Sequence, residues 1–166
     1  MENYILPHFG YIHPNNIEDY YSAEITYHDN KIQFDINFDE TTTDFITLDK
    51  IKNVIERLEK FEEKNKRYIL HDFHNENGET VSSYIEHHLE EIDESTLSKL
   101  IDFTDSSKSR EEQLVDQLKL IRVGIYPNYA EHFITFDYSL GENITPYLVV
   151  INTKENGNLC EILMES

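Results

Sequence analysis

The spacing of apolar residues changes its period twice along this 166-residue chain, and the order of the changes limits the folds open to it. Ile25 and Tyr27, and then the run from Ile32 to Phe38, alternate with polar residues. A period of two is typical of strands with one buried face. Asp29-Asn30, between the two runs, favours a tight hairpin turn. The chain is therefore expected to begin with a β-hairpin.

The middle of the chain follows the helical period instead. Apolar residues from Ile51 to Phe61 lie on one helical face, and Thr47 is the expected N-cap. Ser109 and Glu112 have the spacing of a capping box, which opens a later helix. The expected helices are 47–74, with a bend, 81–92, a short one from 95, and one from 109. We therefore expect three to four central helices.

After residue 120 the period returns to two or gives way to continuous apolar runs, separated by turn-forming segments. The expected strands are 121–126, 132–138, 147–152 and 158–164. Short connections between successive strands favour an antiparallel meander. The whole chain, 1–166, is expected to be one acidic α+β domain, with an N-terminal hairpin, central helices and a C-terminal four-stranded meander packed on the helices.

The net charge excludes several classes of function. There are 33 acidic and 14 basic side chains, which leaves a formal charge of −19. Nucleic-acid binding depends on cations that meet phosphates, so we expect no nucleic-acid partner, and anionic membranes are disfavoured for the same reason. No apolar run approaches the roughly 18 residues of a transmembrane helix, and no secretory signal is visible. A cytoplasmic protein is expected.

No catalytic or cofactor-binding signature is present, and none of the common nucleophile, zinc or phosphate-loop patterns occurs. We therefore expect no cofactor and no enzymatic activity. His71 and His74 are the candidates for a metal site, because two histidines three residues apart can share a helix face. A site needs three or four converging ligands, however, and no second spaced pair supplies them. His88 occupies a core-facing position and is interpreted as a packed, hydrogen-bonded residue.

The acidic segment Asp35-Ile36-Asn37-Phe38-Asp39 resembles the opening of a calcium loop, but Glu40 stands where that loop needs glycine and Ile46 where it needs glutamate. The interleaved apolar residues indicate a strand, which would place Asp35, Asn37 and Asp39 in an anionic row on the solvent face. Such a row is either a solvated surface or a partner-binding surface. Asp35, Asn37, Asp39 and Glu40 are the candidate partner-binding residues.

Two further polar residues stand among apolar ones. Asp137 lies beside two aromatic residues, and we expect it to be half-buried and hydrogen-bonded, with Arg122 on the neighbouring strand as the candidate donor. The lone cysteine, Cys160, cannot form an internal disulfide and is interpreted as a small core side chain. As a nucleophile it would need a histidine, for which His132 is the candidate.

Several segments resemble an uncharacterised bacterial domain family of unknown function. They are Leu6-Pro7-His8-Phe9-Gly10, Tyr84-Ile85-Glu86-His87-His88-Leu89, Gly124-Ile125-Tyr126-Pro127, Phe136-Asp137-Tyr138-Ser139-Leu140-Gly141, Tyr147-Leu148-Val149-Val150 and Met164-Glu165-Ser166. The family is similar to small acidic proteins found beside bacterial contact-dependent and polymorphic toxins, some of which act as immunity proteins. It supplies no catalytic residues that would carry over to this chain.

The sequence therefore leads to a binding protein as the first hypothesis: an immunity-type protein that neutralises a basic toxin or effector domain by occlusion. A metal-assisted hydrolase that uses His71 and His74 is the second. A housekeeping interaction domain whose acidity serves only solubility is the third. The partner's identity and the oligomeric state stay open.

Overall fold

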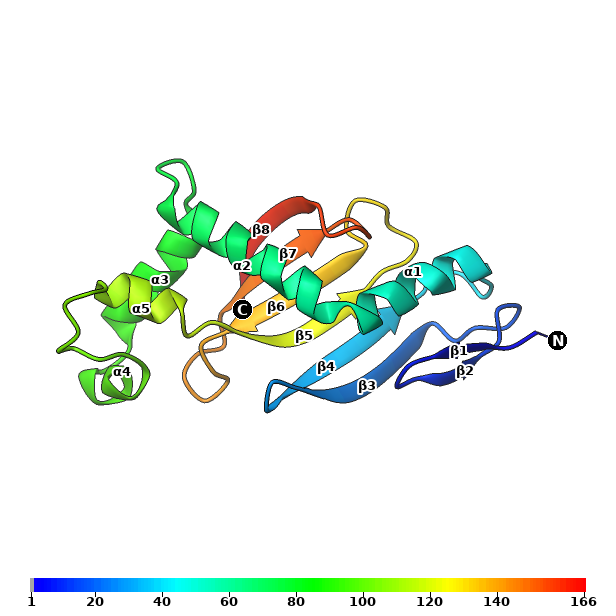
Figure 1. The fold of residues 1–166 in the computed structure, drawn as a ribbon, viewed down its shortest axis with the longest axis horizontal. Helices are drawn as coiled ribbons and strands as arrows, with labels where there is room; N and C mark the ends of the chain where they lie inside the picture. Colours follow the sequence, from blue (N-terminus) through cyan, green and yellow to red (C-terminus); the bar gives the residue numbers. More distant parts are fainter. Residues whose placement is uncertain (1) are drawn as a thin grey trace.

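Helices cover one face of a six-stranded sheet in the computed structural model, which describes residues 2–166 (Figure 1). The sheet has the order β3-β4-β5-β6-β7-β8, so each strand lies beside its neighbours in sequence. Its strands are β3 (Tyr20–Tyr27), β4 (Asn30–Asn37), β5 (Lys119–Ile125), β6 (Ile134–Ser139), β7 (Leu148–Thr153) and β8 (Leu159–Glu165). The expected α+β class, hairpin and C-terminal meander are confirmed.

The hairpin and the meander join through the sheet's one parallel pair, β4 beside β5, among the described residues. All the other neighbours in the sheet pair antiparallel. A parallel pair needs a long crossover connection, and the helical segment between β4 and β5 supplies it. The strand order follows from this junction, which the sequence pattern did not assign.

A second, two-stranded sheet precedes the hairpin and was not expected. Strands β1 (Tyr4–Leu6) and β2 (Gly10–Ile12) pair antiparallel. His8, in the turn between them, and Gly10, the first residue of β2, have positive φ angles. Leu6 and Ile12 are buried, whereas Ile5 and Tyr11 are exposed. These strands are too short for a periodic signal to mark them.

The helical segment begins and divides differently from the expectation. Helix α1 (Phe45–Glu56) is capped by Asp44, whose carboxylate accepts the backbone N–H of Thr47, so Thr47 is not the N-cap. Helix α2 (Leu58–His74) follows after a break at Arg57, which has φ −116° and ψ 26°. The expected bend is therefore a break between two helices.

Three more helices follow: α3 (Thr80–Glu91), α4 (Glu94–Leu100) and α5 (Arg110–Val115). The capping box of Ser109 and Glu112 is confirmed. Residues 2–166 thus contain five helices instead of three to four, because the break at Arg57 makes two helices of one. In Figure 1, α2 crosses the sheet, α3, α4 and α5 gather at one end, and β1 and β2 lie at the other.

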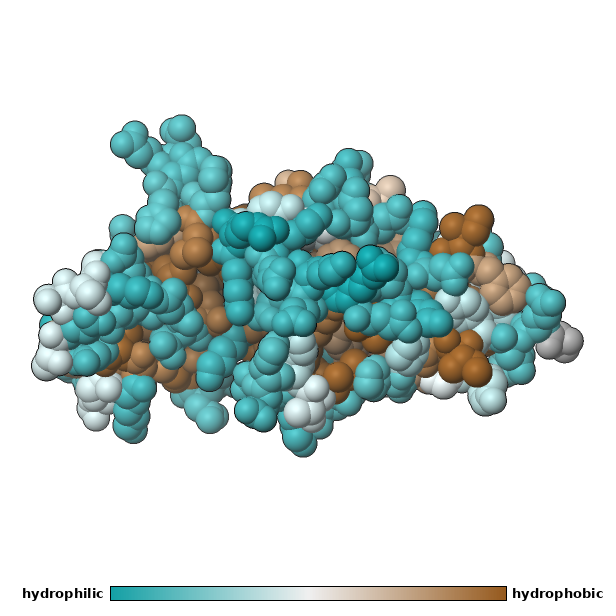
Figure 2. All heavy atoms as spheres, in the orientation of Figure 1, coloured by the Kyte–Doolittle hydropathy of each residue, from teal (hydrophilic) through white to brown (hydrophobic). Residues whose placement is uncertain are grey.

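The core lies between the helices and the sheet face that they cover. Strand residues such as Phe34, Val123 and Phe136 meet helix residues such as Ile51 and Ile85 there, all fully buried. Figure 2 shows the helical side, where hydrophilic residues cover most of the visible surface. The opposite face of the sheet carries no helix, so the side chains on that face can contact solvent or a partner.

Candidate binding site on the helix-free face of the sheet

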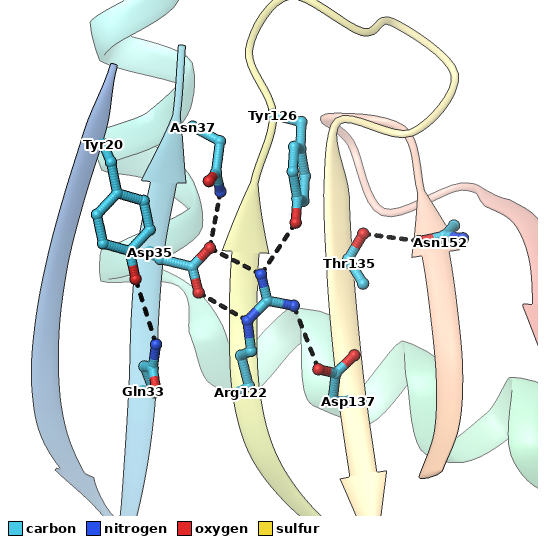
Figure 3. Close-up of polar contacts among 9 residues, drawn as sticks. All are labelled: Tyr20, Gln33, Asp35, Asn37, Arg122, Tyr126, Thr135, Asp137 and Asn152. Atoms are coloured by element: carbon cyan, nitrogen blue, oxygen red, sulfur yellow. Dashed lines mark hydrogen bonds and ion pairs between the residues drawn. The ribbon is translucent and has the colours of Figure 1, made fainter. Parts of the chain in front are cut away.

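Alternate side chains of the central strands point away from the helices, and most of those in the middle of the sheet are polar. The register places Asp35 of β4 opposite Gly124 of β5, and Arg122 of β5 opposite Asp137 of β6. Figure 3 views this face, with the helices behind the strands. The guanidinium of Arg122 therefore lies between the carboxylates of Asp35 and Asp137, on the two neighbouring strands.

Arg122 forms a two-point ion pair with Asp35. Its Nε donates to Oδ1 and its Nη2 to Oδ2 of Asp35, each over 2.7 Å, and Asn37 donates a further hydrogen bond to Oδ2 over 2.7 Å. The Asp35 side chain is only 2% exposed, against 27% for Arg122. A buried carboxylate is costly unless it is paired and hydrogen-bonded, so Arg122 serves first to neutralise Asp35. Burial lowers the pKa of Arg122, but its hydrogen bonds and the two carboxylates outweigh burial and raise that pKa overall.

Gly124 provides the space in which the guanidinium lies. A Cβ atom at this position would lie 2.7 Å from Nη2 of Arg122 and 3.0 Å from Cε2 of Tyr126. The Arg122 side chain and the Tyr126 ring therefore meet over Gly124, where Nη2 donates to the Tyr126 hydroxyl over 2.9 Å. A Cβ atom at this strand position would therefore force the guanidinium to shift.

Asp137 is the second carboxylate of the cluster and is bound less completely than Asp35. Nη1 of Arg122 donates to its Oδ2 over 3.2 Å, which confirms the expected pairing. Asp137 is 7% exposed, and burial raises the pKa of its carboxyl while Arg122 opposes the rise. Within residues 2–166, its Oδ1 has no hydrogen-bond partner, and the side chain lines a cavity.

A second row of polar contacts runs from β6 to β8 on the same face. Thr135 donates to Asn152 over 2.7 Å, and Asn152 donates to Glu161 over 3.0 Å. Nε2 of His132 lies 3.2 Å from the Glu161 carboxylate. These side chains therefore pair with one another across three strands.

A cavity of about 480 Å³ opens between the arginine cluster and this second row. Three carboxylates line it, from Asp39, Asp137 and Glu165, together with the guanidinium of Arg122. These three carboxylates and the one guanidinium sum to a formal charge of −2. The cavity therefore favours a cation or a hydrogen-bond donor, and we call it the carboxylate cavity.

The expected anionic row on β4 is only partly in solvent. Asp35 is buried, so its exposure was predicted wrongly, and Asn37 is half-buried and bonded to Asp35. The alternating pattern could not reveal that Arg122 lies against this part of the strand and covers it. Asp39 and Glu40 are exposed, and Asp39 lines the carboxylate cavity.

The histidines do not converge. His71 and His74 lie in the last turn of α2, and both are exposed. Residues 2–166 contain no group of three or more histidine, cysteine, aspartate or glutamate side chains placed to hold a metal ion. His88 is buried as expected, with Nδ1 2.6 Å from the carbonyl of Tyr84 and Nε2 2.7 Å from the hydroxyl of Thr145.

Cys160 is not a core side chain, which corrects that expectation. It is half-exposed at the start of β8, where its Sγ contacts the backbone carbonyl of Glu131. His132, its candidate partner, interacts with Glu161 instead. Burial raises the pKa of the Cys160 thiol, whereas a nucleophilic cysteine needs a lowered one.

Several residues of the site escaped the sequence reasoning, namely Gly124, Tyr126, Asn152 and Glu165. A glycine within a strand often marks a close approach of another group, so Gly124 carried a usable signal. Asn152 and Glu165 carried none, because polar residues on a solvent face are ordinary. Their position depends on the strand register.

Comparisons with known proteins leave the site to be interpreted from its own residues. No protein-family model, no curated protein and no solved structure matches the chain. Among residues 2–166, none of the helices combines the length and the apolar character that crossing a membrane requires.

Proposed function

We propose that this chain is a non-catalytic binding protein that neutralises a basic protein partner by covering its active surface. The observation that carries the proposal is the carboxylate cavity, which keeps a formal charge of −2 although it contains an arginine. The rest of the molecule reinforces it, because the whole chain carries −19. A field of one sign steers an oppositely charged partner to fast encounter, and occlusion needs no chemistry from this chain.

The resemblance to small acidic proteins found beside polymorphic toxins gives this partner a class: a basic toxin or effector domain, met in the bacterial cytoplasm. The binding surface that we propose includes Asp39 and Glu40, the exposed members of the predicted acidic segment. It continues across the helix-free face to Asp137 and Glu165. Most of the side chains that line this surface are polar or charged, with two tyrosines and one valine among them.

The test is an affinity pull-down with the full chain from a native lysate, washed first at low and then at high salt. A double variant, Asp39→Asn with Glu165→Gln, removes two charges from the proposed surface. A matched control, Glu86→Gln with Glu90→Gln, removes two exposed charges from α3. We expect the wild type and the control to retain one basic protein that salt releases, and the double variant to lose it.

Two results would contradict the proposal. One is that no basic protein is retained from a strain that expresses the genes beside the one that encodes this chain. The other is that the wild type, the double variant and the control retain the same basic protein equally, which would show that binding does not use the helix-free face. For a captured partner, the association rate of the double variant should also be lower and depend less on salt.

No specific observation in residues 2–166 favours either of the alternative hypotheses. A metal-assisted hydrolase based on His71 and His74 would need converging ligands, and the two side chains are exposed at the end of α2. Stoichiometric zinc or manganese in the purified protein would revive it. A housekeeping interaction domain predicts acidity without a basic partner, so the pull-down separates it from the first hypothesis.

A further inference from the structure

We propose that the carboxylate cavity is a receptor for a guanidinium group, supplied by an arginine side chain of the basic partner. This inference rests on the proposed function and names the chemistry of its central contact. Three features of the cavity support it: an open carboxylate oxygen, two tyrosine rings and an arginine with almost no free donor.

The two buried aspartates of the cluster differ in what they leave open. Asp35 accepts three hydrogen bonds, two from Arg122 and one from Asn37. Asp137 accepts one, at Oδ2, and Figure 3 shows its other oxygen directed away from Arg122. The Asp137 side chain is only 10% exposed, so its carboxylate has lost most of its contact with water and gains from each further donor that it can accept. Oδ1 of Asp137 is therefore the acceptor that a ligand would complete.

The surroundings of Asp137 select a cation. Asp39 and Glu165 add two exposed carboxylates to the lining of the cavity. Tyr126 and Tyr129 add aromatic rings. A guanidinium can stack on an aromatic ring and donate to carboxylates at the same time, which an ammonium does less well. Arginine is thus favoured over lysine.

An anionic ligand is excluded by the state of Arg122. Of its five N–H donors, Nε serves Asp35, Nη2 serves Asp35 and Tyr126, and one of Nη1 serves Asp137. One donor is left, and the guanidinium is already paired with the carboxylates of Asp35 and Asp137. A phosphate or carboxylate ligand would have to displace Asp35 or Asp137 from this arginine.

The first experiment uses a short peptide with two arginines and a second peptide with citrulline at the same positions, which keeps the shape and removes the charge. Binding to the full chain is measured at low ionic strength by calorimetry and by amide shifts in ¹⁵N NMR spectra. We expect the arginine peptide to bind at least about tenfold more tightly, with the largest shifts at Gly124, Asp137 and Glu165. Equal binding of the two peptides, or shifts centred elsewhere, would overturn the inference.

The second experiment uses variants of the cavity with the arginine peptide. Asp137→Asn should weaken binding about tenfold or more, and Glu165→Gln about two- to threefold, while the control Glu86→Gln should leave it unchanged. If Asp137→Asn alters the circular dichroism spectrum, Glu165→Gln decides, because that residue is exposed. Unchanged affinity in Glu165→Gln would then overturn the inference.

The two proposals fail separately. If a basic partner is captured and Asp137→Asn binds it like the wild type, the guanidinium receptor is refuted and the binding function stands. If the arginine peptide binds in the cavity but no basic protein is ever captured, the receptor stands and the proposed function is refuted.

Discussion

Replacing Arg122 by methionine tests how much its ion pairs with two buried aspartates contribute to the free energy of unfolding. The change removes both bonds to Asp35 and the bond to Asp137, whose side chains are only 2% and 10% exposed. Removing one partner of a buried ion pair costs about 3–5 kcal/mol, because a charge is left in the protein interior without a partner. Since two carboxylates lose their partner here, we expect a loss in the free energy of unfolding toward the upper end of that range.

A double variant tests whether the loss of stability comes from the unpaired carboxylate of Asp35. Asp35→Asn leaves Arg122 with Asp137 and partial solvent, so it should cost only about 1–2 kcal/mol. The double variant Arg122→Met with Asp35→Asn should be more stable than Arg122→Met alone. In Arg122→Met the Asp35 carboxylate stays buried without its ionic partner, and Asp35→Asn removes that unpaired charge. Coupling of this kind is expected only between residues in contact.

The assay is urea unfolding followed by far-ultraviolet circular dichroism, which suits a chain with no tryptophan. Arg67→Met is the matched control, because Arg67 is exposed on α2, and it should change the free energy of unfolding by no more than about 0.5 kcal/mol. A loss below about 1 kcal/mol for Arg122→Met, or a double variant as unstable as the sum of the singles, would refute the reasoning.

Three further predictions concern stability and are measured by the same unfolding assay. Gly124→Ala should cost about 1–2 kcal/mol, because its Cβ would push Nη2 of Arg122 from Asp35; a neutral result would mean that the guanidinium can shift freely. Burial lowers the pKa of His88, so the folded state holds that proton less readily than the unfolded chain; stability should fall as pH drops below about 6.5, and His88→Gln should weaken this dependence. Ser109→Ala should cost about 1 kcal/mol through loss of the capping box of α5, whereas Ser106→Ala, in the preceding loop, should cost almost nothing.

Periodicity predicted the large elements well because those elements are amphipathic. Every strand of the C-terminal meander lies within two residues of its expected bounds, since turn-forming residues separate short apolar runs. Helix α3 was predicted for the same reason. The N-cap of α1 was predicted three residues too late, at Thr47 instead of Asp44, because both are plausible caps and only geometry chooses between them.

The site was less predictable, since it depends on strand pairing across the whole chain. Local alternation placed Asp35 on the face away from the core, which is correct, but it equated that face with solvent, which is wrong. The contact with Arg122 joins residues 87 positions apart and requires the parallel pairing of β4 and β5. Asp137 was predicted better, because Arg122 reaches it from the adjacent strand of a short meander.

The parallel junction also sets an order for folding during synthesis. When the hairpin of β3 and β4 has been synthesised, the other edge of β4 is unpaired. Strand β5, which pairs with that edge, follows only after more than 80 further residues have been made. An unpaired edge is a template for any other strand, including the same hairpin of a neighbouring nascent chain. Residues 1–46 carry nine acidic side chains and a single basic one, so two such hairpins repel each other. The acidity of this segment therefore also protects an unfinished sheet from joining its own copies.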